Sequence, residues 1–300
     1  VLLACGANAN HYMAPCKSSM RAAIQGDDED IALMLLEHGA DPFYLDDKRH
    51  TYMHIAATLN KPRVLKALAD RGVDVNARDD FVDTALHLAI ENNCHDAVDV
   101  LLSTPGVDLN VRDMAGNPML HHACTSGDAR SVRLIVAKDR SQVHEMLGPC
   151  RYSPLHHAVH DDHEDCVRVM VLEGGADVDQ RYRHNSYTPL LLACARGMYR
   201  AAEALLELGA NLQVRDDSGN TPLHLAVSGR RVEESFGPQS DQEIQMRVTL
   251  ACLLVSNGAL VDAENFKGRG PLASGDPAIR VGVESFITEN PKLVRRQGGG

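Results

Sequence analysis

The amino-acid sequence predicts an all-α solenoid, in which short helix pairs stack side by side and are joined by projecting loops. Two observations lead to this prediction: a four-residue phrase recurs along the chain at a nearly constant step, and a Gly-containing phrase follows it at a nearly constant distance. Aromatic residues are scarce, with 5 Phe, 7 Tyr and no Trp in 300 residues. Thin layers of Leu, Ala and Val fit this composition better than one large core does, and a fixed period is typical of stacked repeats.

The first phrase marks the start of the first helix of each pair. Its clearest copies begin with Thr or Ser, continue with Pro or Ala and then Leu, and in most cases end with His. Eight copies start at residues 18, 51, 84, 118, 153, 188, 221 and 270, in steps of 33, 33, 34, 35, 35, 33 and 49. Thr and Ser are good N-caps and Pro fits the first helical turn, so each copy predicts a helix start.

The second phrase marks the end of the second helix. It consists of Leu-Leu, two further residues, Gly, then Ala or Val, and then Asp or Asn, as in Leu35 to Asp41 and Leu205 to Asn211. Neither predicted helix is long enough to be stable alone, so each pair must bury its apolar face on its neighbours. These phrases in register resemble the ankyrin repeat. The resemblance implies an ankyrin-repeat solenoid of helix–loop–helix pairs connected by β-hairpins or fingers.

The resemblance covers one array over residues 1–291. The segment 1–10 is interpreted as the end of a truncated repeat, because its Gly-containing phrase stands 33 residues before that of Gly39. Repeats one to seven are assigned to 11–43, 44–76, 77–110, 111–145, 146–180, 181–213 and 214–262, a C-terminal cap to 263–291 and a loose tail to 292–300. The 49-residue step predicts a mobile loop within Gly229–Arg247, because Gly237-Pro238 interrupts any packed helix.

Charge and cysteine spacing exclude several classes of protein. Thirty basic and 41 acidic residues give a net charge of −11, which argues against a nucleic-acid or anionic-membrane binder. No apolar run is long enough to span a bilayer, so no membrane insertion is expected. The eight cysteines form no C-x-x-C pair, so neither a zinc site nor a disulfide framework is predicted. Reduced thiols favour a cytoplasmic location, with a nuclear one as the alternative.

Catalytic motifs are missing from the sequence. It contains no phosphate-binding loop, no G-x-S-x-G and no H-E-x-x-H. His156 and His160 stand four residues apart on a predicted helix, a spacing that a metal ion can use. His156 is also the fourth residue of the first phrase, where the resemblance implies a tie to the neighbouring repeat. We therefore expect no enzyme activity, no cofactor, no metal site and no small-molecule substrate.

The predicted fingers are rich in residues that dominate binding surfaces. The eight-residue windows before the phrases hold eight aromatic residues, about three times the share of an even distribution, and Arg recurs at one finger position. Exposed aromatic and Arg side chains are typical of binding hot spots. The candidate partner-binding residues are Arg151, Tyr152, Arg181, Tyr182, Arg183, Tyr187, Phe81 and Arg112. Packing of the aromatic rings between neighbouring fingers is an alternative that stays open.

These observations favour a non-enzymatic module that binds a partner protein on a concave surface of fingers and first helices. The stretch from Gly116 to Pro291 further resembles the ankyrin region of mind bomb-type ubiquitin ligases, in Leu-His-His-Ala at 120–123 and in the insertion of the penultimate repeat. That resemblance implies a recognition segment of a ligase that ubiquitinates Notch ligands, although this chain has no RING spacing. The cytosolic ankyrin domain of a channel or receptor is a third hypothesis.

One asparagine is a candidate modification site. Asn76, with Leu68 and Asp74 before it, resembles the ankyrin motif that an asparaginyl oxygenase hydroxylates. The alternative is that the Asn76 side chain hydrogen-bonds the finger.

Overall fold

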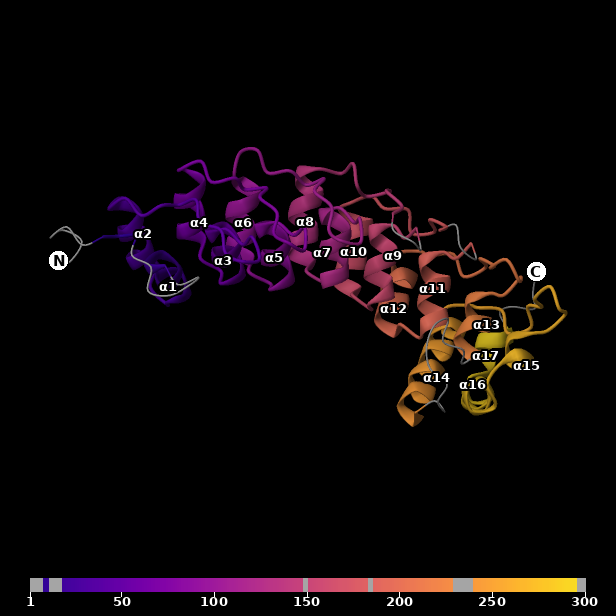
Figure 1. The fold of residues 1–300 in the computed structure, drawn as a ribbon. Coiled ribbons are helices and arrows are strands. Elements are labelled where there is room, and N and C mark those ends of the chain that lie inside the picture. The colour runs from indigo at the N-terminus through magenta and orange to yellow at the C-terminus, as the bar shows by residue number, and fades with distance from the viewer. Residues whose placement is uncertain (1–7, 11–17, 148–150, 183–185, 229–239, 296–300) are drawn as a thin grey trace. The chain divides into compact units, whose positions relative to one another are not determined.

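A computed structural model of the chain describes residues 8–10, 18–147, 151–182, 186–228 and 240–295 (Figure 1). Over these ranges it is built of helices and contains no β-strand, which confirms the predicted all-α class. The helices are α1 (Ser19–Gln25), α2 (Glu29–Glu37), α3 (Tyr52–Thr58), α4 (Pro62–Ala69), α5 (Ala85–Glu91), α6 (His95–Ser103), α7 (Met119–Ser126), α8 (Ala129–Lys138), α9 (Pro154–His160), α10 (Glu164–Leu172), α11 (Pro189–Arg196), α12 (Tyr199–Glu207), α13 (Pro222–Val227), α14 (Asp241–Ser256), α15 (Pro271–Ser274), α16 (Pro277–Glu289) and α17 (Pro291–Arg295). The fingers are turns, with one isolated bridge between Leu147 and Tyr152 among the described residues.

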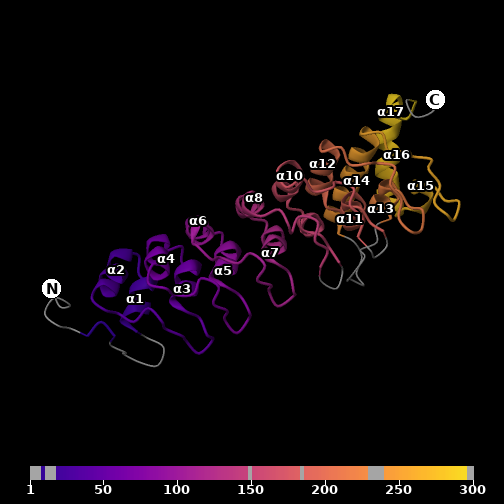
Figure 2. The same cartoon turned by 90° about the horizontal axis from the view of Figure 1, so that it is seen from above.

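The chain divides into two compact units, unit 1 at Val1–Arg140 and unit 2 at Ser141–Gly300. In unit 1 the second helices α2, α4, α6 and α8 form one row and the first helices α1, α3, α5 and α7 form another, beyond which the fingers project (Figure 2). In unit 2, α9, α11, α13 and α15 pack in sequence on one another, as do α10, α12, α14 and α16. Each helix pair therefore buries its apolar face on its neighbours within its unit.

The same local hydrogen bonds recur at the starts of α3 and α13, and the histidine of the first phrase takes part in them. The Nδ1 atoms of His54 and His224 accept the backbone N–H of the N-cap Thr three residues earlier, both at 3.1 Å. Nε2 therefore carries the proton and donates to a carbonyl of the following repeat, Asp83 at 3.1 Å and Arg269 at 2.9 Å. The predicted tie between a helix start and the neighbouring repeat is confirmed at these two positions.

A carboxylate closes the turn of four described fingers, at Asp46, Asp79, Asp113 and Asp216. Oδ1 of Asp79 accepts the N–H groups of Phe81 and Asp83, at 2.8 and 2.9 Å. One residue of each such turn is in the left-handed region, which is Gly116 or Gly219 in two of them, Arg49 in the finger before α3, and Val82 here, with a φ of 68°. A β-branched side chain is strained in this conformation.

Side chains at the end of one repeat also bind the backbone of the next. The amide of Asn76 donates to the carbonyl of Gly106 at 2.8 Å and accepts the N–H of Asp108 at 2.9 Å. Asn10 makes the same pair of bonds to Gly39 and Asp41, at 3.1 and 2.7 Å. These bonds, which we call the Asn ties, fix the register of successive repeats.

The predicted loop within Gly229–Arg247 is wrong for its last seven residues. Helix α14 begins at Asp241 and has 16 residues, because Ser240 and Glu243 form a capping box that starts it early. Residues 229–239 of that prediction lie outside the described residues.

Arg247, placed in the loop by the sequence, is only 4% exposed. Its guanidinium donates to the carbonyls of Ala195 at 3.1 Å, Ala226 at 3.4 Å and Cys194 at 3.5 Å. These carbonyls lie in the last turns of α11 and α13, where a cation is favoured by the helix dipole. The start of α14 is therefore part of the packed structure of unit 2.

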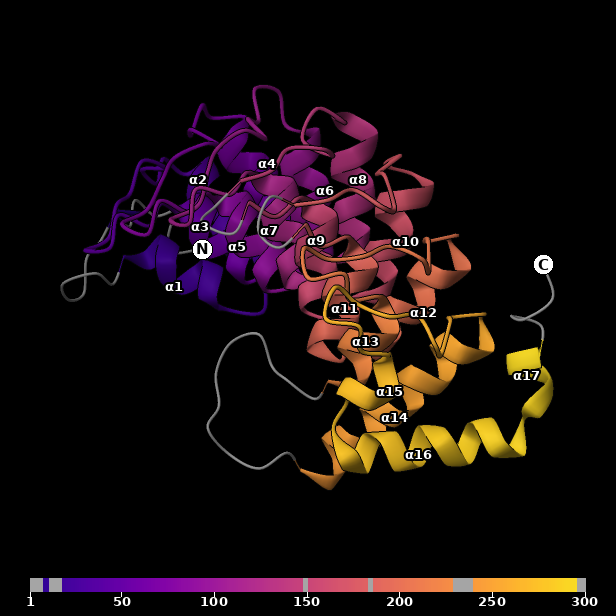
Figure 3. The same cartoon turned by 90° about the vertical axis from the view of Figure 1, so that its right-hand side faces the viewer.

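The C-terminal helices cover the end of unit 2. Helix α16 packs on α14, and the short α17 follows it (Figure 3). Helix α17 spans Pro291–Arg295, so residues 292–295 of the predicted loose tail are helical.

Candidate partner-binding surfaces

The tyrosines of the predicted finger patch in unit 2 pack against one another. Tyr182 and Tyr187 are 5% and 6% exposed. The ring of Tyr182 meets the rings of Tyr152 and Tyr187 edge to face, with centroids 4.9 and 6.0 Å apart. Tyr182 and Tyr187 therefore pack between fingers, which is the alternative that the sequence left open. Arg183 lies outside the described residues.

The recurring finger arginines bind backbone carbonyls. Arg181 donates to the carbonyls of Ser186 at 2.8 Å and Arg215 at 2.9 Å, so its guanidinium joins two successive fingers. Arg112 donates to Gly116 at 3.0 Å in its own finger. Arg215, which recurs at the finger position of Arg112, donates to Gly219 at 3.0 Å and to Glu264 at 2.6 Å, so these arginines hold the fingers.

Part of the patch remains accessible. Arg151 is exposed, and Tyr152 is half-buried beside the rings of His157 and His160, at centroid distances of 5.5 and 5.9 Å. His156, by contrast, is fully buried, and its Nδ1 lies 2.7 Å from Oγ of Ser153. Burial lowers the pKa of His156 to about 3, so its imidazole is neutral.

Unit 1 holds a hollow of about 200 Å³ on its finger and first-helix side. Its lining residues come from α1, the finger before α3, α3 with the residue after it, and α5, and they are Arg21, Gln25, His50, His54, Ile55, Thr58, Leu59 and Leu88. Leu59 is 40% exposed at the end of α3, so an aliphatic side chain is accessible beside ionisable ones. We call this the α1–α5 hollow.

An ionic network forms the finger side of the α1–α5 hollow. Arg21 lies 3.1 Å from Asp46, and His50 bridges the carboxylates of Asp46 at 3.1 Å and Asp79 at 3.3 Å. Burial acts to raise the pKa of Asp46, but hydrogen bonds from His50 and Lys48 outweigh it and hold that pKa below its usual value. The charges on this wall are therefore paired, which leaves the apolar side chains as the accessible feature.

Two apolar finger tips in unit 1 are also exposed. Phe81 is 50% exposed and Met114, on the next finger, is 72% exposed. Arg112, two residues before Met114 in the sequence, is also exposed. Of the predicted binding residues, Phe81 thus presents the largest accessible apolar surface.

Comparison with known proteins identifies the family. Residues 19–113, 105–182 and 172–234 each match the family model described as Ankyrin repeats (3 copies), and together these matches cover more than two thirds of the chain. The chain belongs to the ankyrin-repeat family. The family and the fold are non-catalytic protein–protein interaction modules.

Individual proteins are similar to this chain at modest identity. The chain is 31% identical over 197 residues to the B-cell lymphoma 3 protein homolog of Mus musculus, covering 64% of this chain and 43% of that protein. It is 29% identical over 280 residues to the transient receptor potential cation channel subfamily A member 1 of Drosophila melanogaster, covering 89% of this chain and 22% of the channel. The chain therefore spans less than half the length of these relatives.

The fold also matches a solved ankyrin-repeat structure. The human ASB11 ankyrin repeat domain superposes with a TM-score of 0.59 at 24% sequence identity, over 78% of this chain and 98% of that domain. Within the described part of the chain, no helix is both long enough and apolar enough to cross a membrane.

The α1–α5 hollow was missed by the sequence analysis. Leu59 and Leu88 look like ordinary core residues of an ankyrin helix, and their accessibility depends on where each helix ends and on the spacing of its neighbours. Phe81 was a candidate because of its residue type and its place in a finger, and the structure shows that its side chain is 50% exposed.

Proposed function

We propose that the ankyrin segment recognises a partner protein on the finger and first-helix side of unit 1. The observation that supports this most is the α1–α5 hollow, because it combines accessible apolar side chains with a wall whose charges are already paired. A partner segment gains from burying apolar side chains against Leu59 and Leu88 without having to break the Arg21–Asp46 pair.

The exposed ring of Phe81 extends this surface. It lies in the finger whose Asp83 carbonyl binds His54, one of the residues that line the hollow. Aromatic anchors with an aliphatic surround are the usual centre of a protein interface. The partner is therefore a protein segment rich in apolar side chains, bound where the fingers meet the first helices.

The experiment compares protein capture by the wild-type chain and by variants of this surface. Leu59→Ser and Phe81→Ala should each weaken the captured interaction by about 2 kcal/mol, roughly a 30-fold loss in affinity. Leu172→Ser is the matched control, because Leu172 is a 71% exposed apolar residue of unit 2. Unchanged capture by the Leu59 and Phe81 variants, with unchanged thermal stability, would reject the surface.

The identity of the parent protein sets the biological setting of this recognition. The match over 89% of the chain to a cation channel favours the hypothesis of a cytosolic ankyrin domain in a channel. A membrane-spanning segment in the same reading frame would support it. The recognition segment of a mind bomb-like ubiquitin ligase is the remaining alternative and requires a RING in that reading frame. A tagged chain found in the cytoplasm would agree with all three hypotheses.

A further inference from the structure

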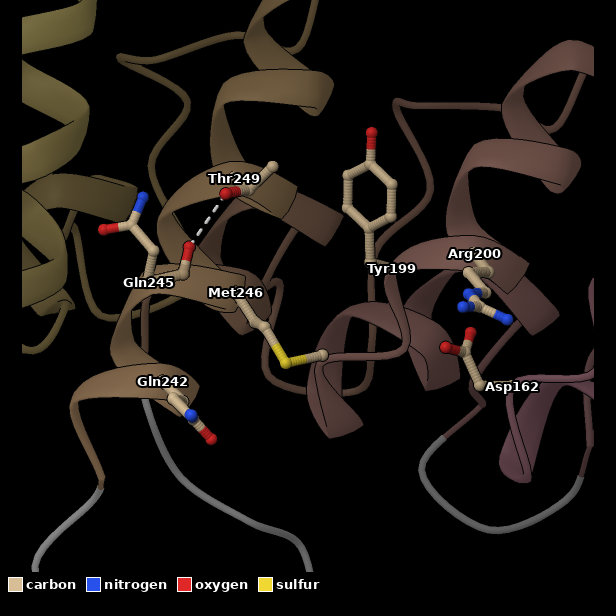
Figure 4. A pocket seen from close by; sticks show the side chains of 7 residues that line it. All are labelled: Asp162, Tyr199, Arg200, Gln242, Gln245, Met246 and Thr249. Carbon is tan, nitrogen blue, oxygen red and sulfur yellow. Dashed lines mark hydrogen bonds between the residues drawn. The ribbon is translucent and has the colours of Figure 1, made fainter.

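Unit 2 contains a second hollow, of about 470 Å³, between α12 and the first turns of α14 (Figure 4). Its lining residues are Asp162, Tyr199, Arg200, Gln242, Gln245, Met246 and Thr249. Helix α14 has 16 residues, whereas the second helices α2, α6, α10 and α12 have nine each. The α14 side of the hollow is therefore built by helical turns that these other repeats do not have.

The hollow has an accessible apolar floor. Met246 is 50% exposed, and in Figure 4 its side chain extends from α14 toward the α12 side. The hydroxyl of Tyr199 donates to Glu203 at 3.0 Å, which holds the tyrosine ring in place. A flexible thioether beside a fixed aromatic ring is an adaptable surface for an apolar side chain of a partner.

Arg200 is an exposed cation that lines the hollow. Asp162 is engaged, because its carboxylate accepts the N–H of Ala201 at 2.8 Å and so caps the start of α12. Arg200 is exposed and makes no close ion pair with a residue in the described ranges, and its charge partly balances that of Asp162 on the same wall. A guanidinium favours a carboxylate partner with which it can make two parallel hydrogen bonds.

The remaining polar groups suit a peptide backbone. Gln242 and Gln245 are both exposed on the α14 side. Each amide offers a donor and an acceptor, which matches the alternating N–H and C=O groups of an extended segment.

We propose that this hollow is a second docking site, which binds a short protein segment carrying an apolar side chain next to an Asp or Glu. The apolar side chain lies between Tyr199 and Met246, and the carboxylate pairs with Arg200. The site lies in unit 2, so it is independent of the α1–α5 hollow proposed above. Its partner can differ from the partner of unit 1.

The test is a selection of displayed random 12-residue peptides on the full chain, with the Met246→Ser variant used for counter-selection. The expected peptides pair Leu, Met or Phe with Asp or Glu, and their affinity falls at least tenfold with Met246→Ser or Arg200→Glu. Arg200→Glu should also reverse the preference, so that peptides with Lys or Arg beside the apolar residue bind instead.

Controls separate this site from its surroundings. Leu172→Ser and Lys267→Glu change an exposed apolar residue and an exposed cation of unit 2 outside the hollow and should leave peptide affinity unchanged. Leu59→Ser, in unit 1, should also leave it unchanged, so failure here is distinct from failure of the proposed function. Thermal melts of each variant show that it is folded.

Four results would overturn the proposal. The first is a selection that enriches no peptide, and the second is a set of enriched peptides without a preference for Asp or Glu. Concentration-dependent dimers that are lost in Met246→Ser would assign the hollow to a second copy of the chain. Peptide binding seen only after residues 229–239 are replaced by a Gly/Ser linker would mean that a segment of this chain occupies the hollow.

Discussion

Replacing the buried Arg247 with Met tests whether the early start of α14 holds unit 2 together. Methionine keeps most of the apolar stem but removes all three contacts to the carbonyls of Ala195, Ala226 and Cys194. The 3.1 Å contact is a charge-assisted hydrogen bond worth about 1.5–3 kcal/mol, whereas the two contacts of 3.4 and 3.5 Å are long and add little. Relief from burying a cation offsets part of this, so Arg247→Met should destabilise unit 2 by about 2 kcal/mol.

Hydrogen exchange measures this loss where it occurs. Stability in a repeat array is local, so the amides of α11, α13 and α14 should lose protection about 30-fold while those of unit 1 stay unchanged. Arg168→Met is the matched control, because Arg168 is an exposed residue in a surface pair with Glu207 and should cost less than about 0.5 kcal/mol. Equal protection in Arg247→Met and wild type, or a loss spread over both units, would refute the reasoning.

Three further predictions follow from the fingers and the buried histidines. Val82→Gly should stabilise unit 1 by about 1 kcal/mol by relieving the φ of 68°, and a lower melting temperature would contradict this. Burial lowers the pKa of His87 and His156 from 6.5 to about 3, so only the unfolded chain takes up these protons just below pH 6.5. The free energy of unfolding should be highest above pH 6.5 and should fall toward pH 3 by up to about 1.4 kcal/mol per pH unit for each histidine. The fall should be shallower in His156→Gln. Melting temperatures that do not change with pH would exclude this coupling. Asn76→Ala should lower local stability by about 1–2 kcal/mol, because both ends of the Asn76 amide are hydrogen-bonded. For the same reason, mass spectrometry after incubation with an asparaginyl oxygenase should find no added oxygen at Asn76. An added oxygen would support hydroxylation.

The helix pairs were predictable because each one depends on residues that are near in sequence. The Thr-to-His spacing that starts α3 and α13 is three residues long, and the structure reproduces it with the expected hydrogen bonds. The early start of α14 also had a local signal, the Ser240 to Glu243 capping box, but the nearby Gly237-Pro238 was given more weight.

The surfaces were harder to predict because they depend on contacts between repeats. Whether Tyr182 is a binding residue or a packing residue is decided by Tyr152 and Tyr187 on either side of it, and their distances cannot be read from composition. The same holds for Arg181, whose second hydrogen-bond acceptor lies 34 residues away. Residue type identified the fingers correctly, but only the packed neighbours show which side chains remain accessible.

The Asn ties also determine how this chain responds to a pulling force. Asn10 and Asn76 each join the end of one repeat to the next, and the step between repeats is about 33 residues. Tension applied along unit 1 therefore acts at these two junctions on the Asn ties as well as on the packed helix faces. When one junction breaks, it releases one repeat, which lengthens the chain by roughly 115 Å at about 3.5 Å per extended residue. We expect unit 1 under load to extend in steps of about one repeat and to shorten again when the same bonds re-form.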